Sequence, residues 1–161
     1  QVICLNCDGG IMMNLQELHT IIENNLKIKI VIFNNDGYLM IKHTQKMLFK
    51  GNYNSVNKKT GIGLPNFKKV FEAFGFDYFE LKEIENLDNT LESFLNSKNQ
   101  SLLEVYMDPN QDFIPKLKGV LMEDKTILSL PLEDMSPLLS FNEIKDNMIS
   151  GISEKSKIVK R

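Results

Sequence analysis

The chain has 161 residues and a formal net charge of −2, with 19 lysine and arginine residues against 21 aspartate and glutamate residues. This near balance argues against a protein that binds nucleic acid through a basic surface. The length suits one domain with a sizeable core, and 42% hydrophobic and 25% charged residues are ordinary for a globular protein. Two cysteines are too few for a disulfide framework or a four-thiolate zinc site.

The sequence contains neither a membrane-segment pattern nor a secretion signal. No apolar run approaches the ~18–20 residues that a membrane helix needs. The start lacks the basic region and the small-residue cleavage site of a signal peptide, so we predict a cytoplasmic protein with no membrane partner. Because the chain opens on Gln1 and enters an apolar run at once, we expect it to be a piece of a longer polypeptide.

Strand and helix patterns alternate through the first two thirds of the chain. Apolar and amphipathic spacing predicts strands over 2–7, 28–33, 76–81 and 101–107, and helices over 14–25, 66–74 and 87–96. We expect the first strand to be buried, Asn14 to cap the first helix, and Gly75 to end the second. Phe67, Phe71 and Phe74 share one helical face and are assigned to the core. The alternation predicts an α/β fold with an open, mostly parallel sheet flanked by helices.

The regular pattern fades near residue 108. We therefore divide the chain into an α/β domain over 1–108 and an extended C-terminal tail over 109–161. Prolines punctuate the stretch 109–140, which we expect to be extended, and a short helix is expected over 141–149. The lysine-rich end over 153–161 is predicted to be disordered.

Two polar clusters follow the first two predicted strands, at residues 8–10 (Asp-Gly-Gly) and 34–37 (Asn-Asn-Asp-Gly). We expect the first to be a tight turn. Ligands of open α/β sheets bind at the carboxyl ends of the strands, so both clusters are expected to face one crevice. The carboxylate of Asp8, the amide oxygen of Asn35 and a backbone carbonyl near Gly37 are hard oxygen ligands that suit Mg²⁺ or Ca²⁺. The two glycines of the first cluster permit close backbone approach, so the pattern predicts a divalent ion with a diphosphate.

The same residues allow other interpretations. Residues 35–37 between two apolar runs are also typical of a hairpin turn, but the run over 38–41 does not alternate as a hairpin strand would. Cys4 and Cys7 match C-x-x-C, yet on a strand they face opposite sides, which favours structural thiols over a redox pair. His19 is expected to be a surface or packed residue, and His43 is a candidate substrate contact.

These residues also carry a resemblance to a known family. The motif of thiamine diphosphate-dependent enzymes is similar to two segments of this sequence. The first is Cys7-Asp8-Gly9-Gly10, and the second is the pair Asn34-Asn35, in which Asn35 lies 27 positions after Asp8. Residues 13–18 and 37–42 resemble the acetolactate synthase-like branch in particular. Residues 132–138 are similar to C-terminal tails of that branch, especially those of proteins encoded in sugar-biosynthesis clusters. The resemblance implies the thiamine diphosphate-binding fold.

The resemblance implies a role for each site residue. Asp8 and Asn35 would bind Mg²⁺ through their side chains, and Gly37 through its carbonyl oxygen. Gly9 and Gly10 would lie against the diphosphate. The cofactor would be lined by Tyr38, Leu39, Met40 and Ile41. Catalysis in the family belongs to the cofactor, so no side chain of this chain is assigned a catalytic role.

The chain departs from the family pattern at two places. Cys7 stands where the motif has its first glycine, and no tryptophan follows the Asn-Asn pair, although acetolactate synthases carry one there. The activating glutamate of the family belongs to a separate domain that these residues do not include. The fragment alone is therefore expected to be inactive.

Taken together, the resemblance implies the C-terminal cofactor-binding domain of a carboligase or decarboxylase that acts on a 2-keto acid such as pyruvate. The parent protein is expected to be a homodimer or homotetramer, because the family's active site forms between two chains, and it could also hold FAD in another domain. A module that keeps the fold but serves assembly or regulation is the alternative. A third hypothesis is a magnesium-dependent phosphotransferase, but the sequence lacks the D-x-D motif and the P-loop that such enzymes use.

Overall fold

The computed structural model describes residues 2–117 and 119–159. The chain divides into two compact units, Gln1–Gln111 and Asp112–Arg161. No helix in the described ranges is long and apolar enough to cross a membrane.

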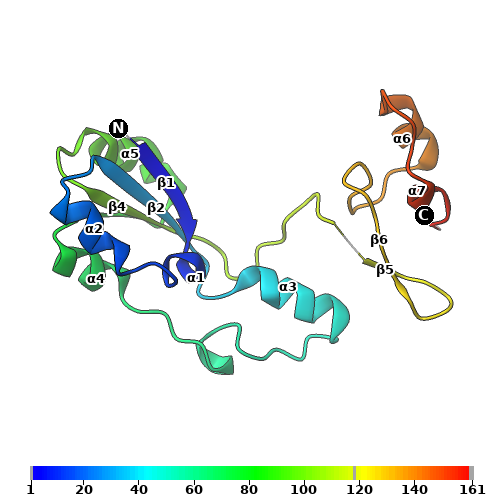
Figure 1. Cartoon of the computed structure of the whole chain (residues 1–161), viewed down its shortest axis with the longest axis horizontal. Helices are drawn as coiled ribbons and strands as arrows, with labels where there is room; N and C mark the ends of the chain where they lie inside the picture. Colours follow the sequence, from blue (N-terminus) through cyan, green and yellow to red (C-terminus); the bar gives the residue numbers. More distant parts are fainter. Residues whose placement is uncertain (1, 118, 160–161) are drawn as a thin grey trace. The chain divides into compact units, whose positions relative to one another are not determined.

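The first unit is built on one sheet of four parallel strands (Figure 1). The strands are β1 (Val2–Cys7), β2 (Ile28–Asn34), β3 (Asp77–Leu81) and β4 (Ser101–Tyr106), in the order β1-β2-β4-β3. All three neighbouring pairs are parallel, and the register places Cys7 opposite Phe33 and Asn34 opposite Tyr106. The predicted open parallel sheet is confirmed, and the carboxyl ends of β1, β2 and β4 lie at one edge.

Helices connect and cover these strands. They are α1 (Asp8–Ile11), α2 (Glu17–Glu23), α3 (Leu39–Leu48), η1 (Lys58–Thr60), α4 (Phe67–Phe74), η2 (Ile84–Asn86) and α5 (Leu87–Asn96). Parallel neighbours need a crossover connection, and the helices between β1 and β2 and between β3 and β4 supply it.

Each face of the sheet packs against its own helices, because successive residues of a strand point to opposite sides. Ile30 and Ile32 of β2 belong to a core with Phe71 of α4 and residues of α1 and α2. Val31, between them, belongs to a second core with Phe94 of α5. The sheet is therefore sandwiched between two helix layers, as expected for an α/β fold.

The strand β1 differs from its prediction as a buried strand. It lies at the edge of the sheet with one neighbour, and Val2 and Leu5 are 59% and 66% exposed. An apolar strand sequence is equally compatible with a buried centre and an edge, so sequence alone does not separate the two positions.

The starts of two helices also differ from the sequence predictions. The cluster predicted as a turn opens the short helix α1 at Asp8, and the next helix begins at Glu17 rather than at residue 14, without a side-chain cap from Asn14. The expectations for α4 are confirmed: the side chain of Asn66 accepts a hydrogen bond from the Lys69 N–H, and Gly75 ends the helix with φ 94°.

The second unit contains regular structure that the sequence did not predict. Residues 119–129 form an antiparallel hairpin of β5 (Gly119–Leu121) and β6 (Ile127–Ser129), followed by α6 (Phe141–Asn147) and α7 (Glu154–Lys157). The Asp124 carboxylate accepts hydrogen bonds from the N–H and hydroxyl of Thr126, which tightens the hairpin turn. The helix expected over 141–149 is present but shorter. The lysine-rich end is helical over 154–157 rather than disordered, and residues 160–161 lie outside the described part.

Candidate cofactor and metal site

The two polar clusters meet at the carboxyl ends of β1 and β2. Asp8, directly after β1, is fully buried. Its Oδ2 accepts hydrogen bonds from the backbone N–H groups of Asn35 at 2.9 Å and Gly37 at 3.0 Å, and its Oδ1 accepts one from Gly9 at 2.7 Å. One carboxylate therefore ties the turn after β2 to the end of β1. The convergence that the parallel arrangement predicted for these residues is present in the structure.

The electrostatic environment of Asp8 contains two opposing effects. Burial raises the pKa of the Asp8 carboxyl, while the N–H groups of Gly37, Gly9 and Asn35 lower it. Burial is the larger effect. Within residues 2–117 and 119–159 no cationic side chain is bonded to Asp8. A buried carboxylate in such a setting favours a positive partner, because a nearby opposite charge offsets the cost of desolvation.

Asn35, whose backbone N–H donates to this carboxylate, also carries a buried side-chain acceptor. Its side chain is only 8% exposed, and its Oδ1 has no hydrogen-bond partner among the described residues. A buried amide oxygen without a partner is rare and costs about 1–3 kcal/mol. A cation bound by the Asp8 carboxylate and this oxygen would satisfy both groups. The donor set therefore fits a hard divalent ion such as Mg²⁺.

The backbone turn that carries Asn35 adopts unusual conformations. Asp36 has φ 61° and Gly37 has φ 145°, a region that L side chains rarely adopt. The side-chain oxygen of Asn34 accepts a hydrogen bond from the Asp36 N–H at 3.0 Å, which stabilises the turn. A β-carbon at Gly37 would overlap the carbonyl oxygen of Val56, so both conformation and space require glycine at this position.

The glycines after Asp8 are required by the packing of this chain itself. A β-carbon on Gly9 would overlap the ring of Tyr38, and one on Gly10 would overlap the side-chain oxygen of Asn6. The Tyr38 ring therefore lies against the backbone of Gly9. Their resemblance-based role beside a diphosphate remains a prediction.

The segment predicted to line the cofactor begins the helix α3. The Tyr38 N–H donates to the Val56 carbonyl oxygen at 2.8 Å, and Leu39 is buried, whereas Met40 and Ile41 are exposed. The hairpin interpretation of this segment is wrong, because residues 39–48 form a helix and not a strand.

The remaining candidates lie apart from the Asp8 carboxylate network. Cys4 and Cys7 are free and exposed, so the side chain that replaces the first motif glycine does not enter the packed interior. His43 Nε2 lies 3.0 Å from the carbonyl oxygen of Gln111, to which it donates, and His19 is exposed. Nothing in these contacts tests a substrate role for His43.

Sequence reasoning missed two supports of the site. The first is Val56, whose carbonyl oxygen binds the N–H at the start of α3. Val56 lies in a loop that the Thr60 hydroxyl stabilises by accepting hydrogen bonds from the N–H groups of Val56 and Asn57. The spacing of Asn57 and Thr60 is that of a capping box, which is a local signal that the sequence does contain. The second is the hydrogen bond that the Asp36 N–H donates to the side-chain oxygen of Asn34, which the sequence analysis also did not predict.

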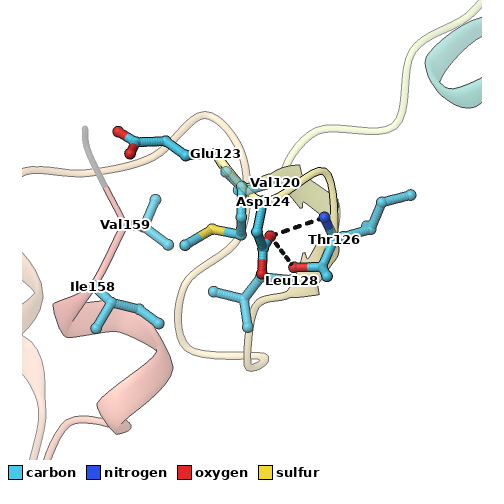
Figure 2. Close-up of a pocket in the computed structure, with 9 residues that line it drawn as sticks. Val120, Glu123, Asp124, Thr126, Leu128, Ile158 and Val159 are labelled. Atoms are coloured by element: carbon cyan, nitrogen blue, oxygen red, sulfur yellow. Dashed lines mark hydrogen bonds between the residues drawn. The ribbon is translucent and has the colours of Figure 1, made fainter.

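The second unit holds a hollow of another character (Figure 2). It is lined by apolar side chains of the hairpin and of residues 158–159, together with the polar side chains of Glu123, Asp124 and Thr126. The carboxylate of Asp124 accepts hydrogen bonds from Thr126, and these bonds lower the pKa of that carboxyl. Among the described residues, no cluster of three histidine, cysteine or acidic side chains could hold a metal ion.

Replacement of Gly37 tests the geometry of the turn. We expect Gly37→Ala to lower the free energy of unfolding by at least about 1–3 kcal/mol, the cost of a backbone conformation that is essentially restricted to glycine. Urea unfolding followed by circular dichroism measures this change. Gly63→Ala is the matched control, because no described atom outside Gly63 and its two chain neighbours lies within 4 Å of the added β-carbon, and it should change stability by less than about 0.5 kcal/mol. Equal decreases in the free energy of unfolding of the two variants would contradict the backbone conformation assigned to Gly37.

Comparison with known proteins identifies the family to which the chain belongs. Residues 1–105 match the family model described as "Thiamine pyrophosphate enzyme, C-terminal TPP binding domain". The chain is 33% identical over 114 residues to the acetolactate synthase large subunit of Porphyra purpurea, covering 71% of this chain and 19% of that protein. It is 28% identical over 115 residues to the acetolactate synthase isozyme 1 large subunit of Escherichia coli (strain K12), covering 71% of this chain and 20% of that protein.

A solved structure has the same fold. The thiamine diphosphate-dependent 4-hydroxybenzoylformate decarboxylase of Rhodococcus jostii RHA1 superposes with a TM-score of 0.59 at 22% identity, over 67% of this chain and 20% of that chain. This chain thus spans about one fifth of the length of the proteins it matches. Because the family model covers most of its residues, the chain belongs to the family of C-terminal thiamine pyrophosphate-binding domains.

Proposed function

We propose that this chain is the cofactor-binding domain of an enzyme that uses thiamine diphosphate and Mg²⁺ to decarboxylate or ligate a 2-keto acid. The observation that carries the proposal is that Asn35, whose N–H donates to the buried Asp8 carboxylate, has a buried Oδ1 with no hydrogen-bond partner among the described residues. Both groups lie at the carboxyl ends of adjacent parallel strands, where open α/β sheets bind ligands.

In this proposal each residue has a defined task. Asp8 and Asn35 hold Mg²⁺ by their side chains and Gly37 by its carbonyl oxygen. Gly9 and Gly10 keep the backbone close to the diphosphate. Tyr38, Leu39, Met40 and Ile41 line the cofactor, and the ring of Tyr38 is already fixed against Gly9.

The chain's own contribution is binding and orientation. The cofactor supplies the chemistry that stabilises negative charge at the carbonyl carbon of the substrate. The Asp8 carboxylate would balance the charge of the cation, and the N–H groups of Asn35 and Gly37 fix the direction of that carboxylate.

The reaction class rests on the relatives. The names acetolactate synthase and 4-hydroxybenzoylformate decarboxylase describe 2-keto acid chemistry, and pyruvate is the substrate we expect first. The missing tryptophan and the segment 132–138 favour a role outside branched-chain amino-acid synthesis, in sugar biosynthesis. An oligomeric parent, cytoplasmic location and FAD in another domain remain predictions.

Replacement of Asp8 tests the metal assignment. We expect Asp8→Asn in the full-length parent to weaken Mg²⁺-dependent thiamine diphosphate binding by at least about 100-fold, because the amide removes a charge and places N–H donors against N–H donors. Equilibrium dialysis with thiochrome detection measures the affinity. Asp88→Asn makes the same chemical change on the exposed start of α5 and should leave binding unaltered. A folded Asp8→Asn protein with wild-type affinity would remove Asp8 from the metal site.

An activity screen separates an enzyme from a non-catalytic module. We expect the parent, loaded with thiamine diphosphate and Mg²⁺, to release CO₂ from pyruvate or another 2-keto acid. Release measured against the same protein treated with a chelator supports the enzyme. Stoichiometric cofactor without turnover of any 2-keto acid tested would support the assembly or regulatory module instead.

A further inference from the structure

A buried carboxylate in the sheet is not used by the proposed site. Glu104 of β4 is only 3% exposed and lies beside Ile32 of β2 and Glu80 of β3 in the register. Its two oxygens have different partners. Oε1 accepts from the side-chain amide of Asn34 at 2.6 Å, and Oε2 accepts from the hydroxyl of Tyr78 at 2.6 Å.

The bond to Glu104 determines how the Asn34 amide is oriented. The oxygen of that amide must face the Asp36 N–H, which is a donor, at 3.0 Å. Its NH₂ group then faces Glu104, which accepts. Both ends of the amide are therefore occupied, and neither can rotate without the loss of a hydrogen bond.

The Asn34 amide in turn stabilises the strained backbone that carries the site. Asp36 has φ 61°, a conformation that is uncommon for a residue with a side chain. The same turn presents the N–H groups of Asn35 and Gly37 to Asp8 and buries the unpartnered oxygen of Asn35. A series of direct contacts thus connects Glu104 to the two proposed side-chain ligands of Mg²⁺.

Glu104 shares its sheet face with apolar neighbours, and its carboxylate also interacts with the Tyr78 hydroxyl and the exposed Lys82 ammonium. The neighbouring inward residues Ile30, Ile32 and Leu102 are apolar and buried. An apolar side chain would fill this position without the cost of desolvating an acid. The hydroxyl of Tyr78 donates to the second oxygen. Burial, followed by this bond to Glu104, raises the pKa of Tyr78, so the hydroxyl stays a donor.

We propose that Glu104 is a positioning residue for the Mg²⁺–diphosphate site, acting through the Asn34 amide on the turn that carries Asn35 and Gly37. The inference rests on the proposed function, and it assigns Glu104 no contact with the cofactor. Outer residues that orient metal ligands typically change metal affinity by about 10–100-fold when they are replaced.

The test is a double-mutant cycle in the full-length parent. The affinity for Mg²⁺ is measured at saturating thiamine diphosphate for wild type, Glu104→Leu, Asn34→Ala and the double variant. We expect Glu104→Leu to weaken Mg²⁺ binding about 10–100-fold in the wild-type background. In the Asn34→Ala background it should have little further effect, because residues that act in one network are not additive. Glu104→Gln, which keeps one acceptor oxygen, should recover most of the affinity.

Two controls keep the result interpretable. Tyr78→Phe removes the other hydrogen bond of the same carboxylate and should lower thermal stability while Mg²⁺ affinity stays within about threefold, since the Asn34 bond remains. If Glu104→Leu does not fold, the cycle is run with Glu104→Gln, whose smaller effect should likewise vanish beside Asn34→Ala.

The outcomes distinguish this inference from the proposed function. Wild-type Mg²⁺ affinity in Glu104→Leu, or equal losses with and without Asn34, would overturn the positioning role and leave the metal site intact. A wild-type parent that binds no thiamine diphosphate with Mg²⁺ would overturn the proposed function, and the role of Glu104 with it.

Discussion

Three backbone N–H groups converge on the buried carboxylate of Asp8, and the arrangement of the site depends on this convergence. One donor comes from Gly9, next to Asp8 itself, and two come from Asn35 and Gly37, at the end of the neighbouring strand. The parallel register of β1 and β2 brings these segments together, and the hydrogen bonds then fix the turn in a conformation that a chain without them would rarely adopt. The fold therefore brings the ends of β1 and β2 together, and the hydrogen bonds of the Asp8 carboxylate fix the conformation of the turn after β2.

The same arrangement leaves two costs that the described residues do not offset. Burial raises the pKa of Asp8, and the Asn35 amide oxygen is buried without a hydrogen-bond partner in the described part of the chain. Unfavourable groups that cluster at the ligand-binding edge of a sheet are typical of a site that is completed by its ligand. The membership of the chain in the thiamine pyrophosphate-binding family gives this ligand a chemical identity, thiamine pyrophosphate, and we propose that a divalent ion accompanies its diphosphate. The contacts from Asn34 to Glu104 extend the prearranged region into the sheet.

Local patterns predicted much of the fold and part of the site. Alternation of strands and helices identified the parallel sheet, and the position of Gly75 correctly ended α4. The meeting of Asp8 with Asn35 followed from strand order alone. Other features depend on tertiary context. Whether β1 is central or at the edge is decided by its neighbours, and the bond between Asn34 and Glu104 joins positions 70 residues apart. The hairpin at residues 119–129 was missed because its strands are only three residues long.

The most direct measurement is the thiamine diphosphate content of the purified full-length parent, determined as thiochrome before and after treatment with a metal chelator. The account predicts nearly one cofactor per chain, lost on chelation and regained when Mg²⁺ and thiamine diphosphate are returned together. A parent that holds no cofactor even when both are supplied would contradict it, because the paired oxygens of Asp8 and Asn35 would then have no ligand of this kind.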